Sequence, residues 1–204
     1  MAEDCFASPV SLDDPRTDQP RDNRIERIQM LDGPTIRLRA MCEDDAPAML
    51  EWRSDPAMYE YFYECLPMSI DTQAQWIREH MNEPRGITFI AESKDTGGPV
   101  GMGSILSIDL RNRTAEYARM LISKECQGKG FAREFHGLIF EYVFDHLGVN
   151  RLWLEIIADN EKMIGMHKRS GFKTDGVLRQ HKFKGGQFID VLIMSMLAEE
   201  YRKA

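Results

Sequence analysis

The 204-residue sequence has few cysteines, and no two of them have the spacing of a metal or redox motif. Its four cysteines, Cys5, Cys42, Cys65 and Cys126, are scattered along the chain. The sequence therefore predicts no metal site and no redox-active pair. Scattered cysteines in a chain of this size are typical of a reducing compartment, so we expect a cytoplasmic protein.

Long apolar runs and an excess of positive charge are also missing. No stretch approaches the ~20 apolar residues of a membrane helix. Met1–Pro20 lacks the basic start and apolar segment of a signal peptide. The formal net charge of −7 disfavours general nucleic-acid binding. We therefore expect neither a membrane nor a nucleic acid as partner. The protein is expected to be a monomer or a homodimer.

Two common phosphate-binding motifs are absent as well. There is no GxxxxGK[ST], and the loop that begins at Gln127 lacks the third glycine of GxGxxG. What remains is QGKGFA, between a predicted strand and a predicted helix. The first N–H groups of a helix favour a phosphate, and Gly128 and Gly130 permit close backbone approach. Spacing alone is equally consistent with an ordinary turn.

The chain divides into a polar segment and one domain. Residues 1–32 contain eight acidic and four basic residues, and thus carry −4 of the net −7. They show little periodicity, so we expect a disordered acidic tail. Residues 33–204 are the predicted domain, and a chain with 43% hydrophobic residues can build a substantial core.

Within the domain, the pattern predicts a mixed α/β sheet with one strand–loop–helix–strand crossover. Helices are expected at 43–54, at 69–81 with Ser69 or Asp71 as cap, at Phe131–Leu147 and at 160–170. Strands are expected at Thr35–Met41, Ile87–Ser93, 99–108, Ala115–Ile122 and Asn150–Ala158, followed by a hairpin that turns at Gly185-Gly186.

Two motifs resemble those of the GCN5-related N-acetyltransferases (GNAT). QGKGFA resembles the family's Q/R-x-x-G-x-G/A signature, and NEKMIGMHKRSGF, Asn160–Phe172, resembles its N-x-x-A-x-x-x-Y-x-K-x-G-F segment. The order of predicted elements from Thr35 to Leu197 also matches. The resemblance implies a mixed sheet of about seven strands with flanking helices, splayed between the fourth and fifth strands. It also implies acetyl-CoA as co-substrate.

A finer resemblance concerns the acceptor. WRSDPAM at Trp52, the helix around Trp76 and KFKGGQFIDVLIMSM near the C-terminus are similar to amino-sugar N-acetyltransferases, in particular the branch for nucleotide-linked 4-amino sugars of the pseudaminic acid pathway. It implies acetyl transfer to a primary amine of a small molecule, namely a nucleotide-linked amino sugar. Ribosomal-protein-type acetylation of a protein N-terminus and a non-catalytic acyl-CoA-binding module remain as alternatives.

The chemistry of acetyl transfer to an amine asks for a base and benefits from an acid. Glu116 lies among apolar neighbours in AEYARML, where burial raises the pKa of a carboxyl group, and it is the candidate base. The alternative is an ordinary surface glutamate. His167 stands where many family members have a tyrosine that protonates the departing thiolate, so it is the candidate acid. The alternative is a histidine on the polar face of a short helix.

The resemblance also implies the residues that bind acetyl-CoA and the acceptor. Backbone groups near Leu121 and Ile122 would meet the acetyl oxygen and the pantetheine arm, and Asn160 and Lys168 would add contacts. The pyrophosphate would lie on Gln127, Gly128, Lys129, Gly130, Phe131 and Ala132. Aromatic and basic side chains suited to a ring or a phosphate make up the acceptor set, which is Trp52, Arg53, Tyr61 and Tyr117. Packing in the core is the alternative, above all for Trp52.

Overall fold

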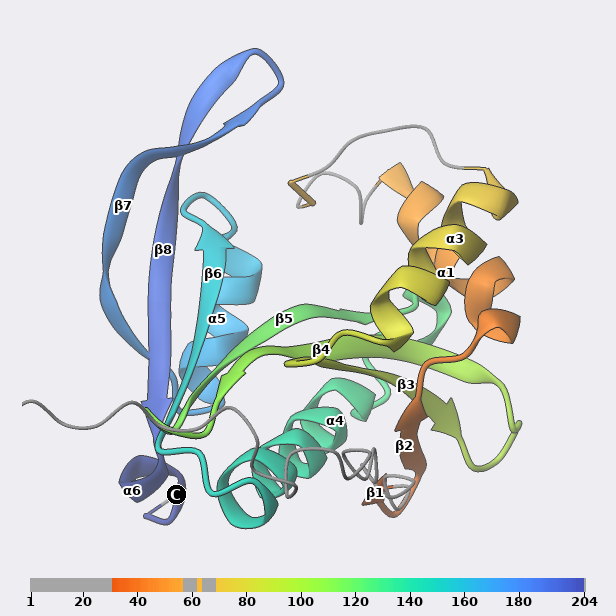
Figure 1. Ribbon diagram of the computed structural model, residues 1–204, viewed down its shortest axis with the longest axis horizontal. Coiled ribbons are helices and arrows are strands. Elements are labelled where there is room, and N and C mark those ends of the chain that lie inside the picture. Colours follow the sequence, from red (N-terminus) through yellow and green to blue (C-terminus); the bar gives the residue numbers. More distant parts are fainter. Residues whose placement is uncertain (1–30, 57–61, 64–68, 204) are drawn as a thin grey trace, which may run out of the picture.

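A computed structural model describes residues 31–56, 62–63 and 69–203 (Figure 1). They form one mixed sheet of eight strands in the order β1-β2-β3-β4-β5-β6-β8-β7. The strands are β1 (Leu31–Asp32), β2 (Ile36–Ala40), β3 (Ile87–Ser93), β4 (Pro99–Asp109), β5 (Thr114–Ile122), β6 (Arg151–Ile157), β7 (Lys173–Lys184) and β8 (Gln187–Leu197). The helices are α1 (Ala46–Ser54), α3 (Ile70–Met81), α4 (Phe131–Phe140), α5 (Glu161–Arg169) and α6 (Ala198–Tyr201).

The predicted mixed α/β sheet with flanking helices is confirmed, with one more strand than the seven expected. The additional strand is β1, whose Leu31 pairs with Leu38 of β2. The sheet therefore begins two residues before the expected domain start at residue 33. A two-residue strand has no periodicity of its own, which is why the sequence does not reveal it.

Helices cover both faces of the sheet. On one face, α4 contributes Phe135 and Ile139 to a large core. On the opposite face, α1 and α3 pack in a smaller core that includes Met49 and Ile77. Along β5, Tyr117 joins the first core, whereas Leu121 joins the second. Each strand thus places alternate residues on different faces, with a change of phase where the strand is irregular.

That irregularity is a bulge in β5 around Arg119, which has a positive φ of 56°. Ser104 of β4 is opposite Ala118, and Met102 is opposite Leu121, so three steps on β5 match two on β4. A bulge of this kind bends its strand and redirects the side chains that follow.

β5 and β6 pair over a short distance and then separate. Their parallel register comprises three residue pairs and ends at Glu116 and Trp153, while β6 remains paired with β8 as far as Ile157. Figure 1 shows β6, β8 and β7 turning away from β5 and β4. The predicted splay is confirmed, because the fourth and fifth predicted strands are β5 and β6.

The helix ends follow their capping residues. Ser69 caps α3 by accepting a hydrogen bond from Thr72 N–H (3.1 Å), as one of the two predicted caps. Asn160 caps α5 through Met163 N–H (3.2 Å). α4 begins at the predicted Phe131, and a π-helix, Glu141–His146, continues directly from its end. Their combined length is therefore close to that expected.

A carboxylate connects the start of β2 to α4. Glu134 Oε1 accepts hydrogen bonds from Thr35 N–H (2.8 Å) and Ile36 N–H (3.0 Å), and Oε2 accepts one from the Thr35 hydroxyl group. Burial by itself raises the pKa of Glu134, but these hydrogen bonds outweigh it, so the pKa lies below its ordinary value. The contact fixes the helix that follows the QGKGFA loop against the sheet.

In the part of the chain that the structure describes, no helix is both long and apolar enough to span a bilayer.

Candidate active site

The QGKGFA loop brings exposed backbone N–H groups to the N-terminus of α4. Gly128 and Gly130 have φ values of 79° and 87°, which favour glycine, and a Cβ atom at either would meet no protein atom within 4 Å. The first helical hydrogen bonds run from Arg133 N–H (3.0 Å) and Glu134 N–H (3.2 Å) to the Gly130 carbonyl group. The N–H groups of Phe131 and Ala132 precede them and point out of the helix end, as an anion requires.

Gln127, the first residue of the loop, has two side-chain contacts outside it. Gln127 donates from Nε2 to the Ile122 carbonyl group (3.3 Å), and its Oε1 accepts from Lys162 (3.4 Å). These contacts join the loop to β5 and α5. Lys129 and Lys168 are exposed, whereas Asn160 is buried as the cap of α5.

The end of β5 lies beyond the last residue pair that it forms with β6. Leu121 and Ile122 are buried there, just before the loop. Gly101 of β4 lies so close that a Cβ atom on it would be 2.5 Å from the Leu121 carbonyl oxygen. Glycine at position 101 thus lets the β5 backbone keep its path after the bulge.

Glu116 lies where β5 and β6 part. Its Oε2 accepts a hydrogen bond from the Ser107 hydroxyl group (3.2 Å). Burial raises the pKa of Glu116, and the negative charge of Glu155 adds to this, although Ser107, Arg119 and Lys182 act in the opposite direction. The net pKa is above the ordinary value, as expected for a carboxyl group that accepts a proton near neutral pH.

Glu155 is a neighbour of Glu116 that the sequence did not single out. Trp153 is opposite Glu116, and residues two apart on a strand share a face, so Glu155 lies on the face of Glu116. Its carboxylate forms an ion pair with Lys182 (3.3 Å) of β7, and Nε2 of His181, the preceding residue, lies 3.7 Å from it. The available signal was a single charge inside the apolar run LWLEII.

Tyr63 completes this group from the opposite side. Lys182 Nζ lies 4.8 Å from the centre of its ring. Burial, then the charges of Glu155 and Glu116, raise the pKa of Tyr63. Tyr63 and Lys182 therefore meet close to the two carboxylates.

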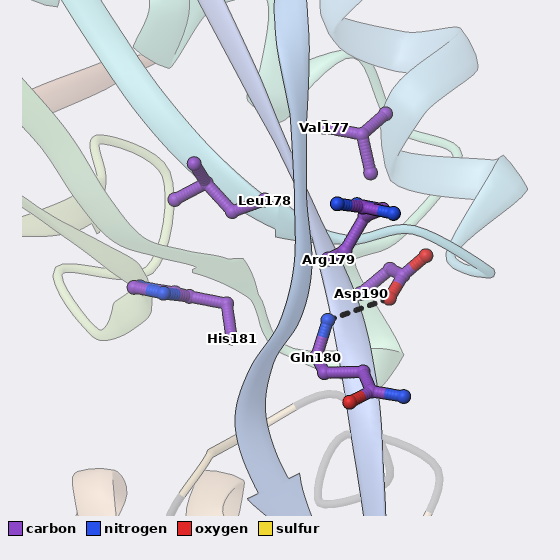
Figure 2. A pocket seen from close by; sticks show the side chains of 6 residues that line it. All are labelled: Val177, Leu178, Arg179, Gln180, His181 and Asp190. Carbon is purple, nitrogen blue, oxygen red and sulfur yellow. Dashed lines mark hydrogen bonds between the residues drawn. The ribbon is translucent and has the colours of Figure 1, made fainter.

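A bulge in β7 directs its side chains to this place. Leu178 is opposite Val191 and Lys182 is opposite Ile189, so β7 advances four residues while β8 advances two. Gln180 has a φ of 51°, and its N–H donates to Asp190 (2.7 Å). Figure 2 shows the depression at the bulge, ≈ 660 Å³ in volume, with Leu178 and His181 on one side of β7 and Val177 and Arg179 on the other.

The predicted acceptor residues are only partly brought together. The guanidinium groups of Arg53 and Arg119 both lie over the Trp76 ring, at 5.5 Å and 4.9 Å from its centre. Trp52 is buried in the smaller core, where packing accounts for it. Tyr61 lies outside the described residues. Arg119 and Trp76 were not among the predicted residues, since neither stands out by spacing.

Tyr117 lies on the other face of β5 from Glu116, in the large core, where packing accounts for it. Its ring is buried with His136 and His167, at centroid distances of 5.6 and 6.0 Å. Burial lowers the pKa of His167 to about 3, and His136 adds to this. His167 is thus neutral near pH 7, which disfavours the imidazolium expected of an acid catalyst.

The chain is similar in sequence to known proteins. A family model described as an acetyltransferase (GNAT) domain matches residues 35–173. The spermidine N(1)-acetyltransferase of Vibrio cholerae is 25% identical over 81% of this chain and 95% of its own length. That of Escherichia coli K12 is 26% identical over 86% of this chain and 87% of its own.

A solved structure is similar as well. The Vibrio cholerae spermidine N-acetyltransferase in complex with CoA and spermine superposes with a TM-score of 0.74, at 25% identity, covering 82% of this chain and 98% of that one. Residues 35–173, which the family model matches, include both motifs. The chain therefore belongs to the GNAT family of acetyl-CoA-dependent N-acetyltransferases.

Proposed function

We propose that the chain acetylates a primary amine of a small molecule and that Glu116 accepts the proton of that amine. The observation that carries the proposal is the half-buried Glu116 carboxylate with a raised pKa, at the point where β5 and β6 separate. A carboxylate whose pKa is raised toward the working pH can receive a proton from an ammonium group and release it again.

The residues present fit acetyl-CoA. The N–H groups of Phe131 and Ala132, with the open space beside Gly128 and Gly130, suit a pyrophosphate. Backbone groups of Leu121 and Ile122 would pair with the arm between β5 and β6, and Lys129 and Lys168 would add positive charge. When bound, acetyl-CoA supplies the acetyl group as a reactive thioester. The protein orients it and takes up the proton of the amine.

For the acceptor, we infer an aliphatic amine. Relatives named as spermidine acetyltransferases act on such amines, and two carboxylates, Glu116 and Glu155, stand on one face where β5 and β6 diverge. The nucleotide-linked amino sugar receives no support from the comparisons.

A panel assay tests this proposal. The full chain is incubated with acetyl-CoA and, separately, with aliphatic monoamines, polyamines, amino sugars and a peptide with a free N-terminus, and thiol release is followed. We expect turnover with aliphatic amines. Turnover only with the peptide would favour the ribosomal-protein-type alternative, and CoA binding without turnover would favour the non-catalytic module.

A further inference from the structure

The acceptor site contains a positive charge of its own. Lys182 is 34% exposed and its Nζ lies 3.3 Å from Glu155 Oε2, while Glu155 is 19% exposed. The same ammonium lies over the Tyr63 ring at 4.8 Å. Because it is held by a carboxylate and an aromatic face together, its position is defined from two sides.

The Lys182 ammonium group occupies the position that the second ammonium group of a diamine would need. An amine delivered to Glu116 places its reacting nitrogen beside that carboxylate, and the nearby Glu155 is the natural partner for a second ammonium group. The Lys182 ammonium group already pairs with Glu155. A second ammonium group would therefore meet a like charge, which disfavours binding.

The bulge in β7 makes this placement possible. Because β7 has two additional residues between Leu178 and Lys182, consecutive residues His181 and Lys182 both reach Glu155. The Gln180 N–H bond to Asp190 holds the bulge, as Figure 2 shows. The placement of Lys182 is thus a feature of the backbone, and bulges of this kind redirect side chains next to active sites.

We propose that Lys182 determines acceptor specificity: it occupies the cation position on Glu155, so that the enzyme selects amines with one positive charge over diamines and polyamines. The inference rests on the proposed function, because it assumes that the acceptor amine reaches Glu116. It separates this chain from the relatives that are named for spermidine.

The test compares pentylamine with cadaverine, which has the same carbon chain and a second terminal amine. We expect the wild-type enzyme to favour pentylamine in kcat/KM, after allowing for the two equivalent amines of cadaverine. In Lys182→Gln, the ratio should shift toward cadaverine by about tenfold, since an interfacial charge pair can contribute this much to discrimination. Lys182→Arg, which keeps the charge, should retain the wild-type ratio.

Arg179→Gln is the matched control. It removes a positive charge from the same bulge, but Arg179 points to the other side of β7 (Figure 2), so the ratio should stay as in the wild type. An equal shift of the ratio in Arg179→Gln would mean that the loss of any nearby positive charge causes it, and would overturn the proposal. So would a wild-type enzyme that prefers cadaverine.

Calorimetry separates this inference from the proposed function. Both amines are titrated into wild-type and Lys182→Gln enzyme saturated with CoA. Turnover of amines with an unchanged ratio of dissociation constants would overturn the role of Lys182 and leave the function intact. A shifted ratio without turnover of any amine would support the role of Lys182 and contradict the function.

Discussion

The His136 imidazole stacks on that of His167, with ring centroids 5.3 Å apart and planes inclined by 27°. Ser170 fixes the tautomer of His136: its hydroxyl group donates to the Met166 carbonyl group (3.2 Å), so it accepts from Nδ1–H of His136 (2.9 Å). Burial lowers the pKa of His136 to about 4. Both rings are therefore neutral near pH 7.

This pair should make stability depend on pH. Unfolded histidine takes up its proton near pH 6.5, but the folded rings do so only near pH 4 and 3. As the pH falls below 6.5, the unfolded state binds more protons and stability falls. The slope should approach about 1.4 kcal/mol per pH unit for each histidine. Urea unfolding between pH 7 and about 5 measures it.

In His167→Phe the slope of unfolding free energy against pH should decrease by the contribution of one of the two histidines. The control is His146→Gln, whose ring is largely exposed; it should keep the wild-type slope. If the two variants have equal slopes, the depressed pKa of His167 is contradicted.

The same variant tests the predicted acid role of His167. A ring that is neutral across the working range has no ionisation there, so His167→Phe should leave the positions of both limbs of the pH–rate profile unchanged. Steady-state kinetics from about pH 6 to 9 check this. Disappearance of the high-pH limb would instead mean that the imidazolium form donates a proton to the thiolate.

Glu116→Gln should lower kcat/KM by roughly 10²–10⁴ and leave acetyl-CoA affinity nearly intact. The loss should shrink at high pH, where the amine arrives deprotonated. Because the pKa of Glu116 is raised, the wild-type acid limb should lie above the ordinary value of 4.5 for glutamate. Normal turnover of Glu116→Gln at neutral pH would contradict the assignment of Glu116 as the base.

Ser107→Ala tests the role of Glu116 without removing its carboxyl group. The Ser107 hydroxyl group lowers the pKa of Glu116 by donating to its carboxylate. Its removal should move the acid limb to higher pH while activity on the alkaline side persists. An acid limb that stays in place would mean that another group titrates.

Gly130→Ala should weaken acetyl-CoA binding by at least about tenfold, or 1.4 kcal/mol, as measured by calorimetry. The added methyl group meets no protein atom within 4 Å, so it would project into the open space, and the φ of 87° strains alanine. The control is Gly137→Ala, which also meets no atom but lies inside α4. It should be stabilising by up to about 1 kcal/mol without an effect on affinity. Unchanged affinity in folded Gly130→Ala would remove the loop from the site.

Glu134→Ala should destabilise the protein by about 1–3 kcal/mol, because the N–H groups of Thr35 and Ile36 lose their acceptor. Because the pKa of Glu134 is lowered, its contribution to stability depends on pH. The contribution is present above the ordinary pKa of 4.5 and is lost on acidification. Urea unfolding at pH 7 measures the change. The exposed variant Glu141→Ala should stay within about 0.5 kcal/mol of the wild type, and equal losses in both would contradict a specific role for Glu134.

Elements with strong periodicity or a specific motif could be predicted from the sequence. The loop from Gln127 and the hairpin turn at Gly185-Gly186 are examples, because glycine spacing and apolar alternation are local signals. The proximity of Glu155, Lys182 and Tyr63 to one another could not be predicted in this way. They meet only through the divergence of β6 and the bulge in β7, which depend on pairing between distant strands. The burial of Tyr117 in the large core could not be predicted for a related reason, since the fold determines which neighbours cover each face of a strand.

The early end of the pairing between β5 and β6 creates an edge inside the sheet. Beyond Glu116 and Trp153, each strand keeps one hydrogen-bonded neighbour and turns its other side to the gap. Amide hydrogens on that side should exchange with deuterium far faster than those within the paired ladders. A co-substrate that fills the gap should slow this exchange, and the melting temperature should then rise with its concentration. The unpaired backbone groups at this gap are thus a place where ligand binding can stabilise the fold.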